Sequence, residues 1–96
     1  MKLQLRTYTI NKGQLEQFTH DFNHKIKAAR ESVGFKVLGA WTVPATNQFV
    51  WIMGLDSGLD WEKHDKAYFD SEARRAMQPD PGLVIARMEN HFIEEA

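Results

Sequence analysis

The stretch from Phe35 to Asp56 constrains the fold of this chain more than any other. Two runs rich in β-branched and aromatic residues flank the turn-forming sequence Pro-Ala-Thr-Asn at positions 44–47. Residues of this kind favour extended strands, and a short break between two such runs is typical of a β-hairpin. The sequence therefore predicts two antiparallel strands joined by a short loop, with the rest of the chain packed against them.

Length and composition indicate one globular domain. The chain has 96 residues, of which 43% are hydrophobic and 26% charged, ordinary values for a soluble fold. Its net charge of −1 comes from interleaved basic and acidic residues, so we expect no nucleic-acid surface and no polybasic membrane anchor. The absence of cysteine excludes disulfides and thiolate metal sites. No apolar run approaches the ~20 residues of a membrane span, and no targeting segment precedes the first strand pattern, so we expect a cytoplasmic protein.

The segment before the hairpin contains a strand and a long helix. Residues 3–9 alternate between two kinds of side chain with a period of two, which is the strand pattern. Over residues 14–33, apolar positions recur every three or four residues and form one helix face. The members of that face are Leu15, Phe18, Phe22, Ile26, Ala29 and Val33. Gly34 follows as the expected end of the helix, where a left-handed backbone is needed.

The segment after the hairpin predicts the remaining elements. Residues 57–60 resemble a capping box with Ser57 as the N-cap, and they predict a helix over 61–70. A further short helix is expected over 71–77, followed by a proline-rich break and a last strand over 83–93. The order β-α-β-β-α-β indicates an α+β protein with a ferredoxin-like antiparallel sheet and helices on one face.

The first strand decides which side chains lie under the helices. Leu3 and Leu5 are its apolar members and are expected to pack there, so that Arg6 and Tyr8 point to the open face of the sheet. An arginine on that face needs an anion, because an unpaired buried cation is costly. Two interpretations stay open: a structural ion pair with Glu89 of the last strand, or a contact with an anionic or enolisable ligand.

The second hairpin strand gives a reason to expect self-association. Val50 and Ile52 are expected under the helices, which sends the larger apolar residues of this strand to the open face. The resulting patch consists of Tyr8, Phe49, Trp51 and Met53. It would be too large for a monomer to leave in water, and a second copy is the simplest cover, so a homodimer is predicted.

The position of Trp41 depends on the length of the hairpin loop. With a loop of residues 44–47, Trp41 pairs near Val50 and shares its face, which is expected to lie under the helices. A loop one residue longer or shorter would move Trp41 to the face of Trp51, because a register shift by one inverts the face. Packing in the core is the favoured interpretation.

Four segments of the chain closely resemble the NIPSNAP family. They are Leu-Arg-Thr-Tyr-Thr-Ile at 5–10, Gly13 with Phe18, Gly-Ala-Trp-Thr at 39–42, and Asn-Gln-Phe-Val-Trp-Ile at 47–52. The resemblance covers nearly the whole chain and implies a dimeric α+β barrel, in which two ferredoxin-like sheets face one another. The family has no widely shared catalytic motif, so the resemblance implies no catalytic residue.

Two classes of function remain open at this point. The superfamily of dimeric α+β barrels includes cofactor-free monooxygenases, haem-degrading enzymes and aldoxime dehydratases. An enzyme acting on a small apolar or enolisable substrate is therefore one candidate, on analogy of fold. The other candidate is a module that binds a small apolar or anionic ligand, or that serves only in assembly. No metal or cofactor is predicted, and the expected partners are a second copy and a small molecule, without nucleic acid or membrane.

Six residues are the candidates for ligand contacts in the barrel: Arg6, Tyr8, Trp51, Met53, His64 and His91. Either histidine would suit a general base near neutral pH or an axial haem ligand. A hydrogen-bonded or solvated histidine is the simpler interpretation of both.

Two further groups of residues are interpreted as surface features. His20 and His24 have the i, i+4 spacing of a two-histidine metal site, but they lie opposite the apolar face of the first helix and have no evident third ligand. Asp56, Asp60 and Asp65 are interpreted as helix-cap and surface charges.

Overall fold

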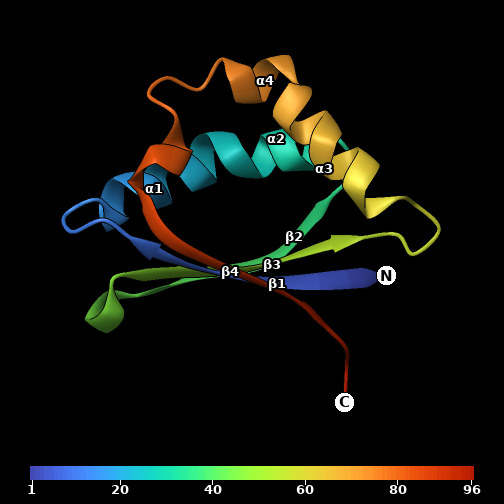
Figure 1. Cartoon of the computed structure of the whole chain (residues 1–96), viewed down its shortest axis with the longest axis horizontal. Helices are drawn as coiled ribbons and strands as arrows, with labels where there is room; N and C mark the ends of the chain where they lie inside the picture. Colours follow the sequence, from blue (N-terminus) through green and yellow to red (C-terminus); the bar gives the residue numbers. More distant parts are fainter.

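The structure is a computed structural model that describes residues 1–96, and its centre is a four-stranded antiparallel sheet with helices on one face (Figure 1). The strand order across the sheet is β2-β3-β1-β4. The elements in chain order are β1 (Lys2–Ile10), α1 (Leu15–Asp21), the π-helical turn η1 (Phe22–Ile26), α2 (Lys27–Ser32), β2 (Lys36–Val43), the 3₁₀ turn η2 (Pro44–Thr46), β3 (Gln48–Leu55), α3 (Trp61–Asp70), α4 (Glu72–Arg75), the 3₁₀ turn η3 (Pro81–Val84) and β4 (Ile85–Ile93). The predicted β-α-β-β-α-β order is confirmed.

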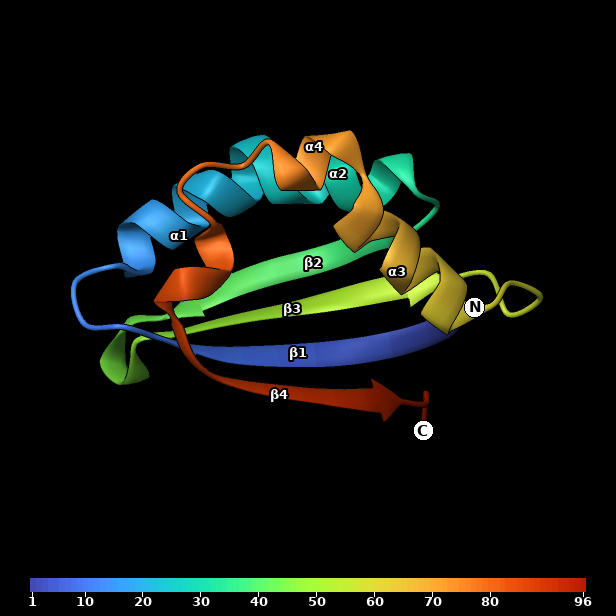
Figure 2. The same cartoon turned by 45° about the horizontal axis from the view of Figure 1, so that its top comes forward.

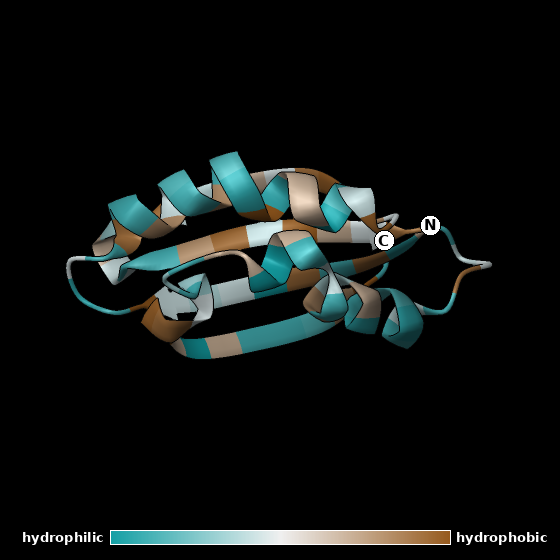
Figure 3. Ribbon diagram, turned by 90° about the horizontal axis from the view of Figure 1, so that it is seen from above, coloured by the Kyte–Doolittle hydropathy of each residue, from teal (hydrophilic) through white to brown (hydrophobic).

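The first helical segment runs from α1 through η1 to α2 and lies over one face of the sheet, roughly along its strands (Figure 2). Its predicted apolar face is confirmed, because Phe18, Phe22, Ile26 and Ala29 are buried and the two end members pack against them. Gly34 has φ +101° after the helix, as expected for a helix end. Seen from above, the helices are mostly hydrophilic, whereas hydrophobic residues lie along the central strands beneath them (Figure 3). None of the helices combines the length and apolar character needed to cross a bilayer.

Helices α3 and α4 lie beside the first helical segment over the same face of the sheet (Figure 3), and each begins at a capping side chain. Asp60 is the N-cap of α3 and accepts a hydrogen bond from the Lys63 backbone N–H at 3.2 Å. The predicted cap at Ser57 is therefore wrong, because the carboxylate of Asp60 stands directly before the helix and reaches its free N–H groups. Ser71 is the N-cap of α4, and its side chain accepts a hydrogen bond from the Arg74 backbone N–H at 3.1 Å.

The two faces of β1 are the reverse of the sequence prediction. Gln4, Arg6 and Tyr8 lie under the helices and are buried, whereas Leu3 and Leu5 lie on the open face. The prediction counted Leu3 and Leu5 as the core positions because they are apolar. The polar side chains are tolerated inside because they bond to one another and to Asp65, as described below.

Strand β3 is reversed in the same way, since its residues pair with those of β1. Tyr8 pairs with Phe49, and Arg6 pairs with Trp51, so these residues share the covered face. The predicted open patch is therefore wrong: Tyr8, Phe49, Trp51 and Met53 are all part of the buried core. The covered face takes these bulky side chains because the helices bring Phe18 and Phe22 against them, whereas Val50 and Ile52 lie half-buried on the open face.

Trp41 lies on the open face of the sheet. Its pairing with Val50 and the loop of residues 44–47 are confirmed, but its predicted place under the helices is wrong because Val50 itself faces outward. Trp41 is 55% exposed. Its ring covers Gly39, where an added Cβ would lie 2.4 Å from the nearest ring carbon. Gly39 therefore provides the space that lets the indole lie flat against the strand.

The orientation of the first helical segment predicts a large difference between two of its residues. Phe22→Ala should lower the free energy of unfolding by about 3–5 kcal/mol, because the ring packs on Phe49 and Trp51 in the core. His24→Ala, on the exposed side, should change it by less than about 0.5 kcal/mol. Urea denaturation measures both values, and equal losses would contradict this orientation of the helix.

Candidate functional site

A cavity of about 110 Å³ lies between the sheet and the helical layer. Its walls come from β1, β3, the first helical segment, α3, α4, η3 and β4. Six of the side chains that line it carry polar groups: Arg6, Tyr8, Arg30, Trp51, Tyr68 and Arg74. The remaining walls are mostly apolar. The cavity therefore combines three guanidinium groups with an aromatic interior.

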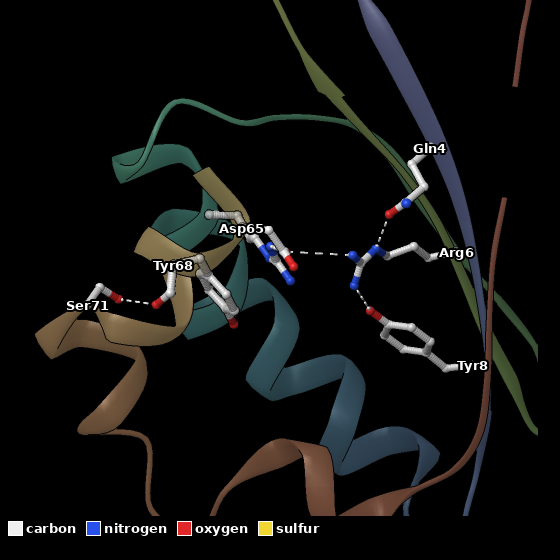
Figure 4. A network of polar contacts seen from close by, with 7 residues as sticks. Gln4, Arg6, Tyr8, Asp65, Tyr68 and Ser71 are labelled. Atoms are coloured by element: carbon white, nitrogen blue, oxygen red, sulfur yellow. Dashed lines mark hydrogen bonds and ion pairs between the residues drawn. The ribbon is translucent and has the colours of Figure 1, made fainter. Parts of the chain in front are cut away.

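Arg6 projects from β1 toward α3 (Figure 4). Its Nε donates a hydrogen bond to Gln4 Oε1 at 2.7 Å, and its Nη1 donates to the Tyr8 hydroxyl at 3.1 Å. Its Nη2 lies 3.8 Å from Asp65 Oδ1. The predicted partner Glu89 is wrong, because Glu89 pairs with Thr7 on the opposite face and contacts Arg87 at 3.4 Å.

Arg30 is a buried cation at the centre of the helical layer. It follows Ile26 by one helical turn, which puts its side chain at the edge of the apolar face. Its Nη1 donates a hydrogen bond to Asp65 Oδ1 at 2.6 Å, and its guanidinium carbon lies 3.7 Å from the centroid of the Tyr68 ring. Burial lowers the pKa of Arg30, and the hydrogen bond to Asp65 partly offsets this effect.

Arg74 is the third arginine that lines the cavity. Its Nη2 donates a hydrogen bond to Asp80 Oδ1 at 2.7 Å, and the same oxygen accepts from the Gly82 backbone N–H at 2.8 Å. The bond from Gly82 lowers the pKa of Asp80, and Arg74 adds to this effect. Burial raises the pKa of Tyr68, although the positive charges of Arg30 and Arg74 act in the opposite direction.

The charges around the cavity do not cancel. The cations are Arg6, Arg30 and Arg74, and the carboxylates that contact them are Asp65 and Asp80. Three positive charges and two negative charges leave one net positive charge. A cavity of this kind, with partly desolvated cations, attracts one negative charge more strongly than the open surface does.

The structure brings together three of the six predicted ligand contacts. Arg6, Tyr8 and Trp51 line the cavity, although on the covered face of the sheet rather than on the open one. Met53 is fully buried in the core and does not reach the cavity. His64 lies on α3, where its Nδ1 is 2.8 Å from the Asp60 carbonyl oxygen. His91 is exposed on the open face opposite Leu5, so neither histidine reaches the cavity.

The remaining histidines are surface residues. The rings of His20 and His24 stack with their centroids 4.1 Å apart, and both lie on the exposed side of the first helical segment. No three side chains among histidine, aspartate and glutamate lie close enough together to hold a metal ion.

Sequence reasoning missed Arg30, Tyr68 and Arg74 as site residues, and it interpreted Asp65 as a surface charge. Asp65 instead joins two buried arginines from different elements. One signal could have found Arg30: its spacing from Ile26 extends the apolar face of the helix. Nothing local marks Asp65 as its partner, because 35 positions separate the two residues.

The fold and the covered cavity define the class of protein: an α+β, ferredoxin-like chain with the fold of the dimeric α+β barrel superfamily. The NIPSNAP family model matches residues 3–96, so the chain belongs to the NIPSNAP family. No curated protein matches the sequence.

Solved structures with the same fold have distant sequences. A NIPSNAP family protein of unknown function from Agrobacterium tumefaciens is 17% identical, with a TM-score of 0.87 over 100% of this chain and 88% of its own. An uncharacterised NIPSNAP domain protein from Burkholderia xenovorans is 19% identical, with a TM-score of 0.82 over 100% of this chain and 95% of its own. A candidate antibiotic biosynthesis monooxygenase from Nitrosomonas europaea is 9% identical, with a TM-score of 0.70 over 99% of this chain and 98% of its own. These likenesses establish the fold.

The pairing of Arg30 with Asp65 predicts a coupled loss of stability. Asp65→Asn should lower the free energy of unfolding by about 2–4 kcal/mol, because it removes the counter-charge of a buried guanidinium. Combined with Arg30→Met, the loss should be smaller than the sum of the single losses by about 1–3 kcal/mol.

The exposed pair Lys66–Asp70 is the matched control on the same helix. Its coupling in the same double-mutant cycle should stay below about 0.5 kcal/mol, as expected for a surface ion pair. Additive losses for Arg30 and Asp65 in denaturant titrations would show that the two residues do not act as a pair.

Proposed function

We propose that this NIPSNAP protein binds a small molecule with a negatively charged end in the cavity between the sheet and the helices. One observation carries the proposal: every polar side chain that lines the cavity offers an N–H or O–H donor, and no carboxylate, amide or imidazole lines it. The ligand must therefore supply acceptors, and the net positive charge favours an anion. The Tyr8 hydroxyl accepts a hydrogen bond from Arg6, which leaves its own hydrogen free to donate.

The apolar walls indicate the other part of the ligand. Phe18, Ile26, Phe69, Ile85 and Met88 also line the cavity. Hydrophobic walls with a few convergent polar groups are typical of small-molecule sites. Phe69 and Met88 are 47% and 46% exposed, which supports entry from the surface between α3 and β4. The ligand is thus an anion with an apolar body.

The proposal predicts thermal stabilisation by small anions. Benzoate at about ten times its Kd should stabilise the folded protein by about 1.4 kcal/mol, which raises Tm by roughly 5–10 °C for a chain of this size. Arg74→Gln should reduce that shift, because it removes one cation of the cavity, whereas Arg75→Gln, one residue away on an exposed position, should retain it. Differential scanning fluorimetry measures both shifts. A Tm that no organic anion raises at millimolar concentration would contradict the proposal.

We further propose that two copies associate through the open face of the sheet. Trp41 and Val43 are exposed there, next to the half-buried Leu5, Val50 and Ile52. An apolar patch on the outer face of a sheet is typical of an interface, and most homo-oligomers are two-fold. The fold class supports the same arrangement. The sequence analysis predicted the same partner, a second copy, and the same open face of the sheet. It assigned other residues to that face, namely Tyr8, Phe49, Trp51 and Met53, which are buried in the core.

The dimer predicts a particle of twice the 11.1 kDa chain mass in light scattering at micromolar concentration. Trp41→Glu should shift the equilibrium toward the monomer, because it puts a charge into the apolar interface. Leu83→Glu is the matched control, since Leu83 is 73% exposed but belongs to η3 rather than to the open face. A monomeric wild-type protein would contradict this arrangement.

An enzyme of the cofactor-independent monooxygenase kind is the second candidate. The specific observation in its favour is the cation cluster, which would favour the deprotonated form of an enolisable substrate. Dioxygen uptake with such a substrate would distinguish this candidate from binding alone. Haem does not fit this cavity, because a volume of about 110 Å³ is far smaller than the macrocycle and none of the histidines lines it.

A further inference from the structure

Two buried donors in the structure have no hydrogen-bond partner. They are Trp51 Nε1 and Arg30 Nε, on side chains whose residues are 1% and 2% exposed. Folded proteins satisfy most buried donors, because an unpaired one has lost its water without replacement. Two such donors in one small region therefore call for an explanation.

Both donors belong to residues that line the cavity. The guanidinium carbon of Arg30 lies 6.0 Å from the centroid of the Trp51 ring, and that of Arg6 lies 5.6 Å from it. Both guanidinium groups therefore lie close to the indole ring whose N–H has no partner. Tyr8 is on the same strand face, two positions from Arg6, and adds a fourth donor.

We propose that the ligand is the carboxylate of a single aromatic ring, with its carboxylate oxygens held by Trp51 Nε1 and Arg30. This inference rests on the proposed function and specifies the ligand for the same cavity. Trp51 is the residue that determines specificity, because its indole N–H distinguishes an acceptor from a donor at this position.

Three features favour a carboxylate over other anions. The net charge of the surrounding groups is one positive, from Arg6, Arg30 and Arg74 against Asp65 and Asp80, and a monoanion neutralises it. A phosphate dianion would leave a negative excess in a partly desolvated site. A carboxylate is also planar and has acceptors only, so it matches a site in which every polar side chain offers a donor.

The size and walls of the cavity favour one flat ring. A volume of about 110 Å³ is smaller than the ~150 Å³ of an apolar cavity that accepts benzene, so at most one ring lies within it. Tyr8, Phe18 and Tyr68 lie on its sides, where rings can meet a ligand ring edge to face. A long alkyl chain would extend beyond these walls.

The indole N–H of Trp51 provides a direct test. The chain has three tryptophans, so the ¹H–¹⁵N spectrum of the ¹⁵N-labelled protein has three indole resonances, which Trp41→Phe and Trp61→Phe assign by elimination. On titration with benzoate, the Trp51 resonance should move downfield and saturate with the same Kd as the thermal shift. The Trp41 and Trp61 resonances should stay in place.

Variants and analogues of the probe separate the possible outcomes. Trp51→Phe keeps an aromatic ring but lacks the donor, and it should weaken benzoate binding about 10–100-fold, whereas Trp61→Phe should leave it unchanged. Benzamide and inorganic phosphate should each bind at least tenfold more weakly than benzoate to the wild-type protein. The last comparison and the Trp51 resonance need no variant at position 51, so they remain decisive if Trp51→Phe does not fold.

Different failures have different meanings. Benzoate binding with an unmoved Trp51 resonance, or phosphate binding as tightly as benzoate, would overturn the assignment of the carboxylate to Trp51 and leave the proposed anion site standing. Binding of no anion at all would overturn both.

Discussion

The ion pair between the buried Arg30 and the part-buried Asp65 is the contact on which the arrangement of the helices over the sheet depends. Arg30 comes from α2 and Asp65 from α3, and the same carboxylate oxygen also faces Arg6 on β1. A guanidinium that is 2% exposed needs a counter-charge, because the free energy of an unpaired buried cation is prohibitive. This requirement fixes α3 against the first helical segment and over β1. The stacking of Arg30 on Tyr68 adds a second contact between the same two helices.

The same cluster explains why a polar strand face lies inside the protein. Gln4, Arg6 and Tyr8 satisfy one another through side-chain hydrogen bonds, so their burial leaves few polar atoms unpaired. The aromatic residues of β3 and the first helix pack beside them and supply the hydrophobic stabilisation. The core is therefore made of two parts, an aromatic cluster and a cationic cluster, and the cavity lies where the two meet.

The sequence predicted the elements well because their signals are local. The apolar face from Phe18 to Ala29 and the loop at 44–47 follow from periodicity and turn chemistry within short windows. The faces of the sheet were predicted wrongly, since alternation specifies two faces without saying which is covered. Side-chain volume would have identified the covered face better than hydropathy. The bulky Trp51 is buried in the core, whereas the smaller Val50 lies on the open face. The pairing of Arg30 with Asp65 joins distant segments, so no local pattern reveals it, and with it the position of the site was missed.

The central claim is that the covered cavity, rather than the space between two facing sheets, holds an anionic ligand. A crystal structure of the protein with 4-bromobenzoate, measured at the bromine absorption edge, tests this most directly, because the anomalous signal locates the ligand independently of the protein phases. The account predicts one bromine peak per chain between the sheet and the helices, with the carboxylate next to Arg30 and Trp51. A peak on the open face near Trp41, or no peak at a concentration that saturates the thermal shift, would contradict it.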